Sequence, residues 1–225
     1  MKPSKKSRKR TYKTSKEPSS DFSHNVFINC PFDDHYNPLF HAMVFTIHLL
    51  GFRPRCSREQ QDSGRVRLDK LMEIMVECKF GIHDISRTEP DPINRLPRFN
   101  MPFELGMDIG FRHVGDVQCK SKIHLIFDTK PYRFQKFLSD ISGQDIAFHS
   151  NRASKVVSAV RDWLRTATDA DDMPSGAIVY KHYKRFRRNL PKICEASDLQ
   201  IEELNFLDYS HTVAEWIKQN YKKNP

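Results

Sequence analysis

Short apolar runs alternate with longer amphipathic stretches between residues 25 and 130, and this alternation constrains the fold more than any other feature. The runs have the length of strands, whereas the stretches between them repeat apolar residues at helical spacing. This order favours right-handed crossovers, so the sequence predicts an α/β fold with a parallel sheet that helices cover on both faces. The predicted strands are NVFINC (25–30), FRPRC (52–56), FGIHDIS (80–86) and KIHLIFD (122–128), and the predicted helices cover 38–51, 68–79 and a stretch from about Pro102.

The chain divides into three predicted parts. Residues 1–24 hold eight Lys and Arg residues against Glu17 and Asp21, a net charge of +6 out of the formal +9 of the whole chain. This segment has no apolar periodicity, so we expect a disordered basic arm. Such an arm either binds nucleic acid by releasing counterions or only keeps the protein in solution. An α/β domain over 25–169 and a helical C-terminal extension over 170–225 follow.

The pattern after residue 130 is less regular. We predict helices over 153–165, 177–190 and 208–221, and a loop over 137–149. The basic residues of the second helix favour a solvated face whose aromatic neighbours pack inward, although they would also suit phosphate groups. These basic residues are Lys181, Lys184, Arg185, Arg187 and Arg188.

Composition excludes several classes of protein. The five cysteines are odd in number and widely spaced, which argues against a disulfide framework or a zinc site and for a reducing cytoplasm. The ten histidines lack a metal-ligand spacing such as H-E-x-x-H, so no metal centre is expected. No apolar run reaches the roughly 20 residues that span a bilayer, and we expect no membrane association. There is also no Gly-rich phosphate-binding loop.

Within RFNMPFELGMDIG (98–110), the acidic residue Glu104 has apolar or small residues on both sides, from Met101 to Met107. Pro102 suits a first helical turn, which would place Glu104 near the positive end of a helix dipole, where its pKa falls and it stays ionised. Alternatively, Glu104 only stabilises the helix through the dipole and has no catalytic or binding role. Gly106 and Gly110 share one face and would let the helix approach the sheet closely. Asp84 ends a predicted strand, so we expect both carboxylates at one rim of the sheet.

Two carboxylates at such a rim suit the cleavage of a ribosyl C–N bond. The transition state of that reaction resembles an oxocarbenium ion, which a carboxylate beneath the anomeric carbon stabilises or attacks. GIHDIS, FNMPFELGMDIGF and KIHLIFD together resemble the core of the nucleoside 2-deoxyribosyltransferase-like families, and VFINCPFDDHYNPLFHAMVFTIHLLGF resembles their first strand, loop and helix. The related Toll/interleukin-1 receptor (TIR)-like NAD-cleaving domains share this flavodoxin-like layout. The resemblance covers about residues 25–130.

The resemblance implies roles for individual residues. Glu104 would be the nucleophile or charge-stabilising carboxylate, and Asp84 would hold the base or ribose. Asn100 would orient the sugar, while Asn29 and Asp33 would line the ribose side of the pocket. The approach to Glu104 departs from the Gly- or Asn-Pro-Asn-type sequence of the deoxyribosyltransferases, which affects the identity of the base and acceptor more than the fold.

Arginines near the predicted rim favour a phosphorylated substrate. Arg65, Arg87 and Arg98 would bind phosphate, so NAD or a (deoxy)nucleotide is favoured over a free nucleoside, as a substrate and not as a cofactor. We expect an N-glycosidase or transferase with a role in bacterial stress or phage defence. The alternative is a non-catalytic TIR-like module that senses a nucleotide or binds a protein. In either case the sequence leaves open whether the protein forms a homo-oligomer.

Overall fold

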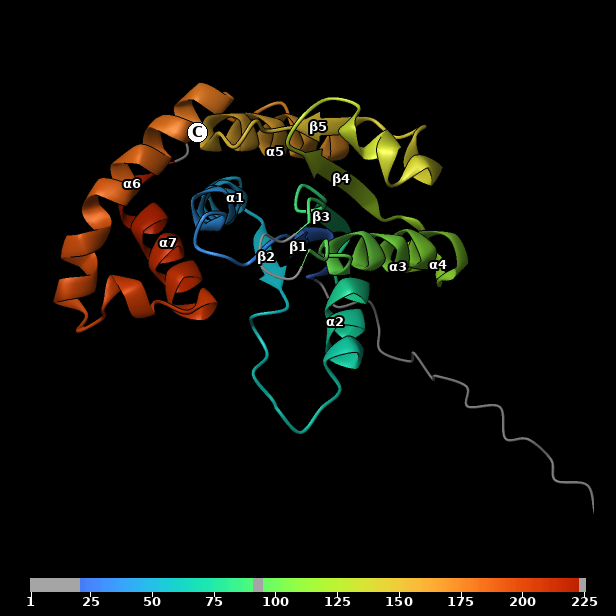
Figure 1. Ribbon diagram of the computed structural model, residues 1–225. Helices are drawn as coiled ribbons and strands as arrows, with labels where there is room; N and C mark the ends of the chain where they lie inside the picture. The colour runs from blue at the N-terminus through green and yellow to red at the C-terminus, as the bar shows by residue number, and fades with distance from the viewer. Residues whose placement is uncertain (1–20, 91–94, 223–225) are drawn as a thin grey trace, which may run out of the picture.

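The computed structural model describes residues 21–90 and 95–222, which form a five-stranded parallel sheet with helices on both faces (Figure 1). The strand order is β2-β1-β3-β4-β5, the order of flavodoxin-like folds. The predicted α/β flavodoxin-like class is therefore confirmed. The strands are β1 (Asn25–Asn29), β2 (Arg53–Cys56), β3 (Phe80–Asp84), β4 (Ile123–Asp128) and β5 (Ile146–Phe148).

Helices form a layer on each face of the sheet, and two more lie outside one of these layers. Figure 1 shows α1 and α5 on one face, α2 and α3 on the other, and α6 and α7 packed outside α1 and α5. The helices are α1 (Asn37–Leu49), α2 (Arg67–Val76), α3 (Asn100–Val114), α4 (Val117–Lys120), α5 (Ala153–Thr168), α6 (Gly176–Ala196) and α7 (Phe206–Asn220). In the described residues no helix is both long and apolar enough to cross a membrane.

Strand β1 shows why the apolar runs do not alternate with polar residues. All five of its residues are buried, because both faces of the sheet are covered. Val26 and Ile28 belong to the apolar cluster under α1 and α5, whereas Phe27 belongs to the cluster of α2 on the opposite face. The edge strand β2 contains Pro54, as expected from its missing N–H.

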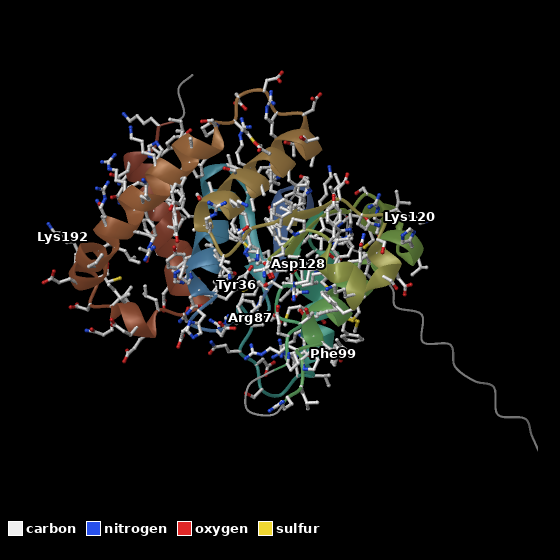
Figure 2. The ribbon with its side chains drawn as sticks, turned by 45° about the horizontal axis from the view of Figure 1, so that its top comes forward. Tyr36, Arg87, Phe99, Lys120, Asp128 and Lys192 are labelled. Carbon is white, nitrogen blue, oxygen red and sulfur yellow. The ribbon has the colours of Figure 1, made fainter. Side chains whose placement is uncertain are left out.

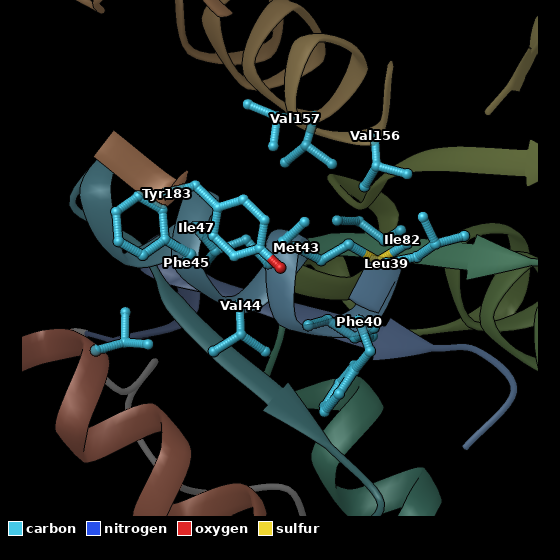
Figure 3. Packing of buried hydrophobic residues seen from close by; sticks show 14 of the residues in the cluster. Leu39, Phe40, Met43, Val44, Phe45, Ile47, Ile82, Val156, Val157 and Tyr183 are labelled. Atoms are coloured by element: carbon cyan, nitrogen blue, oxygen red, sulfur yellow. The ribbon is translucent and has the colours of Figure 1, made fainter. Parts of the chain in front are cut away.

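Helix α1 is buried around most of its circumference, so it needs covering on its outer side as well. Met43 and Ile47 lie in the same cluster as Ile82 of the sheet, while Phe45 packs on Tyr183 of α6 with ring centroids 5.5 Å apart (Figure 3). The predicted C-terminal helices are present, and they complete the main core instead of forming an appendage.

Three local expectations are corrected. The loop predicted over 137–149 contains β5, which pairs with β4 through only three residues, too few for a recognisable pattern. The boundary of the basic arm is also too late, because Phe22 is buried and its carbonyl accepts a hydrogen bond from the Lys79 amide. Residues 1–20, the rest of the arm, lie outside the described residues. Finally, a Cβ on Gly106 or Gly110 would meet no atom within 4 Å, so neither glycine serves close packing.

Candidate active site at the carboxyl end of the sheet

The chain reverses its direction of winding between β1 and β3, which are neighbours in the sheet, and ligands bind at such switch points in open α/β sheets. Asn29, the last residue of β1, joins the elements that meet there. Its side-chain amide donates to Nδ1 of His83 at 3.1 Å and to the carbonyl of Met101 at 2.9 Å. Asn29 is buried, so it does not line a pocket as the sequence suggested. It positions the start of α3 at the switch point.

Glu104 lies on α3, the helix whose start Asn29 holds, and 11% of its side chain is exposed. The helix begins at Asn100, two residues earlier than predicted, so Glu104 falls in the second turn and outside the main reach of the helix dipole. Burial raises the pKa of Glu104 from 4.5 to about 7, and the charge of Arg67, whose Nη2 lies 3.9 Å from Oε1, opposes this rise. The expectation that the helix terminus lowers this pKa is wrong, because desolvation outweighs the dipole.

Three of the predicted substrate-binding residues meet beside α3. Nη2 of Arg87 donates to Oδ1 of Asp33 at 3.1 Å, and Nη1 of Arg98 lies 3.6 Å from the other carboxylate oxygen. Asp33 also accepts a hydrogen bond from the backbone amide of Tyr36. Figure 2 shows Arg87 near Tyr36 in the middle of the molecule. Arg98 is exposed and Arg87 is half-buried, and both keep further N–H groups for an anionic ligand.

Asp84 ends β3 as predicted, but it is fully buried and does not face solvent beside Glu104. The hydroxyl of Tyr36 donates to Oδ2, the amide of Ser86 donates to Oδ1 at 2.8 Å, and Nε2 of His149 lies 3.0 Å from Oδ2. Because Nδ1 of His149 accepts from the amide of Asn151, the imidazole proton is on Nε2, the nitrogen that lies close to Asp84. These partners occupy Asp84, which leaves it a positioning role in holding three loops together.

The two carboxylates nevertheless act on a common point at this end of the sheet. Burial raises the pKa of the Cys30 thiol well above its usual value, and the negative charges of Asp84 and Glu104 raise it further. The guanidinium of Arg58, in the loop after β2, acts on the same thiol in the opposite direction. Cys30 directly follows β1, so both acids lie close enough to the end of β1 to act on this thiol.

Behind Glu104, one turn along α3, Asp108 forms a buried polar cluster. Its Oδ2 accepts from Nε2 of His83 at 3.0 Å and lies 3.2 Å from Nε2 of His124, and its Oδ1 lies 3.1 Å from Nζ of Lys122. Burial alone would raise the pKa of Asp108, but the two imidazoles and the ammonium group hold it well below its usual value. A Cβ on Gly81 would lie 2.6 Å from Oδ2, so this cluster requires glycine in the middle of β3.

The groups of His83, Asp108 and His124 lie within 4.8 Å of one another, a spacing that would suit a metal ion. The hydrogen bonds argue against that reading. The amide of Asn29 donates to Nδ1 of His83, so Nε2 carries the proton and has no free lone pair for a metal. Lys122 already supplies the positive charge that the carboxylate requires. The cluster is therefore a buried Lys122–Asp108 ion pair with His83 hydrogen-bonded to the carboxylate and His124 close to it, which fixes α3 to the sheet.

The two remaining predicted residues lie further out. Arg65 pairs with Glu73 of α2 at 2.5 Å and lines a cavity of about 250 Å³. Arg67 lines the same cavity. The arginine that contacts Glu104 is Arg67 and not the predicted Arg65, two positions earlier. Asn100 is the exposed first residue of α3. The cavity is lined by Ser57, Gln60, Asp62, Ser63, Arg65, Arg67, Lys70, Leu71 and Ile74.

Sequence analysis did not single out Tyr36. The sequence offers Arg67 only as one of several arginines suited to phosphate, and His149 only as one of the polar residues of 137–149 that would cap a pocket or close a loop. Tyr36 and His149 contact Asp84 from sequence distances of 48 and 65 residues, and no local pattern marks either one. Fold and site together define a flavodoxin-like α/β protein with a largely buried carboxylate, Glu104, near its switch point, and burial raises the pKa of this group. None of the protein-family models, curated proteins or solved structures compared with the chain matches it.

Proposed function

We propose that this protein cleaves or transfers the N-glycosidic bond of NAD or of a (deoxy)nucleotide, with Glu104 acting on the anomeric carbon. The observation that carries the proposal is a largely buried carboxylate at the switch point whose pKa of about 7 leaves it partly ionised near neutral pH. Groups with strongly shifted pKa values in such positions are common in active sites. The resemblance of residues 25–130 to N-glycosidic enzymes supports the same reaction.

The chemistry requires only the ionised form of Glu104. As the C–N bond breaks, its electron pair leaves with the base, and the carboxylate either stabilises the oxocarbenium ion or bonds to the anomeric carbon. Water then adds to the anomeric carbon and gives up a proton to solvent, which leaves the sugar phosphate with a free anomeric hydroxyl, or a second base adds in a transfer. The departing base of a (deoxy)nucleotide takes up a proton from solvent. Nicotinamide in NAD is already cationic, so it leaves without a proton. Its positive charge would also favour the ionised form of Glu104.

Arginines in the loop before α3 suit a phosphorylated substrate. Arg87 and Arg98 offer guanidinium groups to a phosphate while Asp33 holds them in place. Phe99 and Phe103, which are 64% and 57% exposed at the start of α3, offer aromatic surfaces for stacking. Asp84 contributes by keeping the loops after β3 and β5 in position.

Mass spectrometry of a mixture of NAD and (deoxy)nucleotides incubated with the purified protein tests the proposal. We expect free nicotinamide or another free base from the wild type and from Glu73→Gln, which removes an exposed carboxylate on α2. Glu104→Gln should release none while keeping its circular dichroism spectrum. The absence of release by the wild type at high protein concentration would reject the enzyme.

The exposed Phe99 and Phe103 also favour a second candidate function, a non-catalytic module that binds a nucleotide or a protein at this rim. Thermal-shift measurements with the same nucleotides separate the two functions. Stabilisation by a nucleotide without any turnover would support the binding module, since binding alone shifts the unfolding equilibrium.

A further inference from the structure

Helix α6 lies on the outside of the molecule and has two different faces (Figure 1). Its inner face packs on the core through Val179, Tyr183, Phe186, Leu190 and Cys194, all of which are buried. The aromatic residues therefore point inward, as the sequence suggested. Tyr180 and Ile193 are partly buried against the same core, whereas the Lys and Arg side chains of this 21-residue helix are exposed. Figure 2 shows Lys192 at the edge of the molecule, far from Arg87.

The outer face is basic and contains no acidic residue between positions 176 and 194. In the described part of the chain none of its six basic side chains forms an ion pair, and the one polar contact among them joins Arg185 to the amide oxygen of Asn220 at 3.3 Å. We call this set the α6 basic face. Its members, all exposed, are Lys181, Lys184, Arg185, Arg187, Arg188 and Lys192.

The charge of this face acts on its neighbours. Burial, together with the positive charges of Arg187 and Arg58, lowers the pKa of His41 to about 4. Burial also lowers the pKa of His182, with contributions from Arg185 and Lys181 in the same direction. Basic residues of this face thus contribute to a positive potential at both imidazoles.

Aromatic rings hold several of these cations in place. Nζ of Lys184 lies 5.3 Å from the ring centroid of Tyr180, and the guanidinium of Arg185 lies 5.7 Å from that of Trp216. Such contacts already restrict a long side chain before a ligand binds, so the side chain loses less conformational entropy on binding. Lys184, Arg187 and Arg188 surround a hollow of about 390 Å³, which places three positive charges around one space on the surface.

We propose that the α6 basic face binds the sugar–phosphate backbone of nucleic acid, a function separate from the proposed reaction at Glu104. Residues 181–192 span roughly 17 Å along the helix, which matches about five successive phosphates of one strand. Contacts of this kind are independent of base sequence. The alternative polyanion, an acidic membrane surface, is disfavoured because no large apolar side chain is exposed between Lys181 and Lys192 to enter the bilayer.

Fluorescence anisotropy with a 30-base-pair DNA duplex and a 30-nucleotide RNA, at several salt concentrations, tests this surface in the full chain. The triple variant Lys184→Gln/Arg187→Gln/Arg188→Gln should bind at least about tenfold more weakly at low salt. The slope of log K against log salt concentration should become shallower by roughly two to three. The basic N-terminal residues are present in every variant, so the difference isolates α6.

A matched control removes three exposed charges elsewhere, through Lys120→Gln/Lys130→Gln/Lys136→Gln. This control should bind nearly as tightly as the wild type, and Glu104→Gln should bind equally, so failure of the proposed reaction leaves this result unaffected. Equal losses in the two triple variants, or no loss in the α6 variant, would overturn the proposal. Tighter binding of the wild type to vesicles with 30% phosphatidylserine than to either nucleic acid would overturn it as well. The charge-preserving variant Arg187→Lys/Arg188→Lys should retain most of the affinity, which separates charge from folding.

Discussion

Replacement of Glu104 by Gln should stabilise the folded protein at alkaline pH. The folded state holds this carboxyl at a pKa of about 7, compared with 4.5 in an exposed chain. The folded state therefore binds the proton more tightly than the unfolded state, and the stability that this proton contributes is complete below pH 4.5 and is lost as the pH rises through 7. Gln mimics the neutral acid at every pH and avoids this loss.

The size of the effect follows from the shift. At 1.36 kcal/mol for each pKa unit, the ionised carboxylate costs the folded state about 3 kcal/mol at pH 8.5, and only a small part of that at pH 5. Because only 11% of the side chain is exposed, solvent screening reduces this figure little. The contact with Arg67, which is 65% exposed, contributes less than about 1 kcal/mol and offsets the gain slightly.

Urea denaturation of the wild type and Glu104→Gln at pH 5, 7 and 8.5 measures this difference in the free energy of unfolding. Other titrating groups are common to both proteins and cancel in the comparison. Glu73→Gln, which alters an exposed carboxylate, should show a small difference that does not change with pH. A Glu104→Gln protein that is less stable than the wild type at pH 8.5, or equally affected at all three values, would refute the reasoning.

Three further predictions concern activity and packing. The kcat/KM of base release should rise with pH through an apparent pKa near 7, and Arg67→Ala should move this rise to higher pH, because Arg67 lowers the pKa of the site carboxylate. Gly81→Ala should cost about 1–3 kcal/mol in urea denaturation, since its Cβ would meet Asp108, whereas Gly106→Ala meets nothing and should be neutral or stabilising by up to about 1 kcal/mol. Arg87→Ala should raise KM for a phosphorylated substrate and leave KM for the matching nucleoside unchanged; equal effects on both would contradict a phosphate-binding role.

The order of strands and helices was predictable because it depends on local periodicity. Runs such as KIHLIFD are buried on both faces, and helices such as 153–165 repeat apolar residues on one side, so short windows are sufficient. The position of Glu104 near the carboxyl end of β3 follows from the same pattern. Strand β5 escaped prediction because its three residues are too few to show a period.

The chemical state of the site depends on groups that are far apart in the sequence. Asp84 is enclosed because Tyr36 and His149 contact it from two other loops. No residue spacing in the sequence predicts these contacts. The pKa of Glu104 depends on how much water the packed helices exclude from its carboxyl group. The position of Glu104 near a helix terminus in the sequence does not reveal this exclusion. Sequence alone thus determined the α/β architecture and the carboxylate to consider. Only the tertiary structure decided that Asp84 is fully enclosed while Glu104 keeps a small exposed fraction and a raised pKa, because desolvation and long-range hydrogen bonds arise when distant segments pack together.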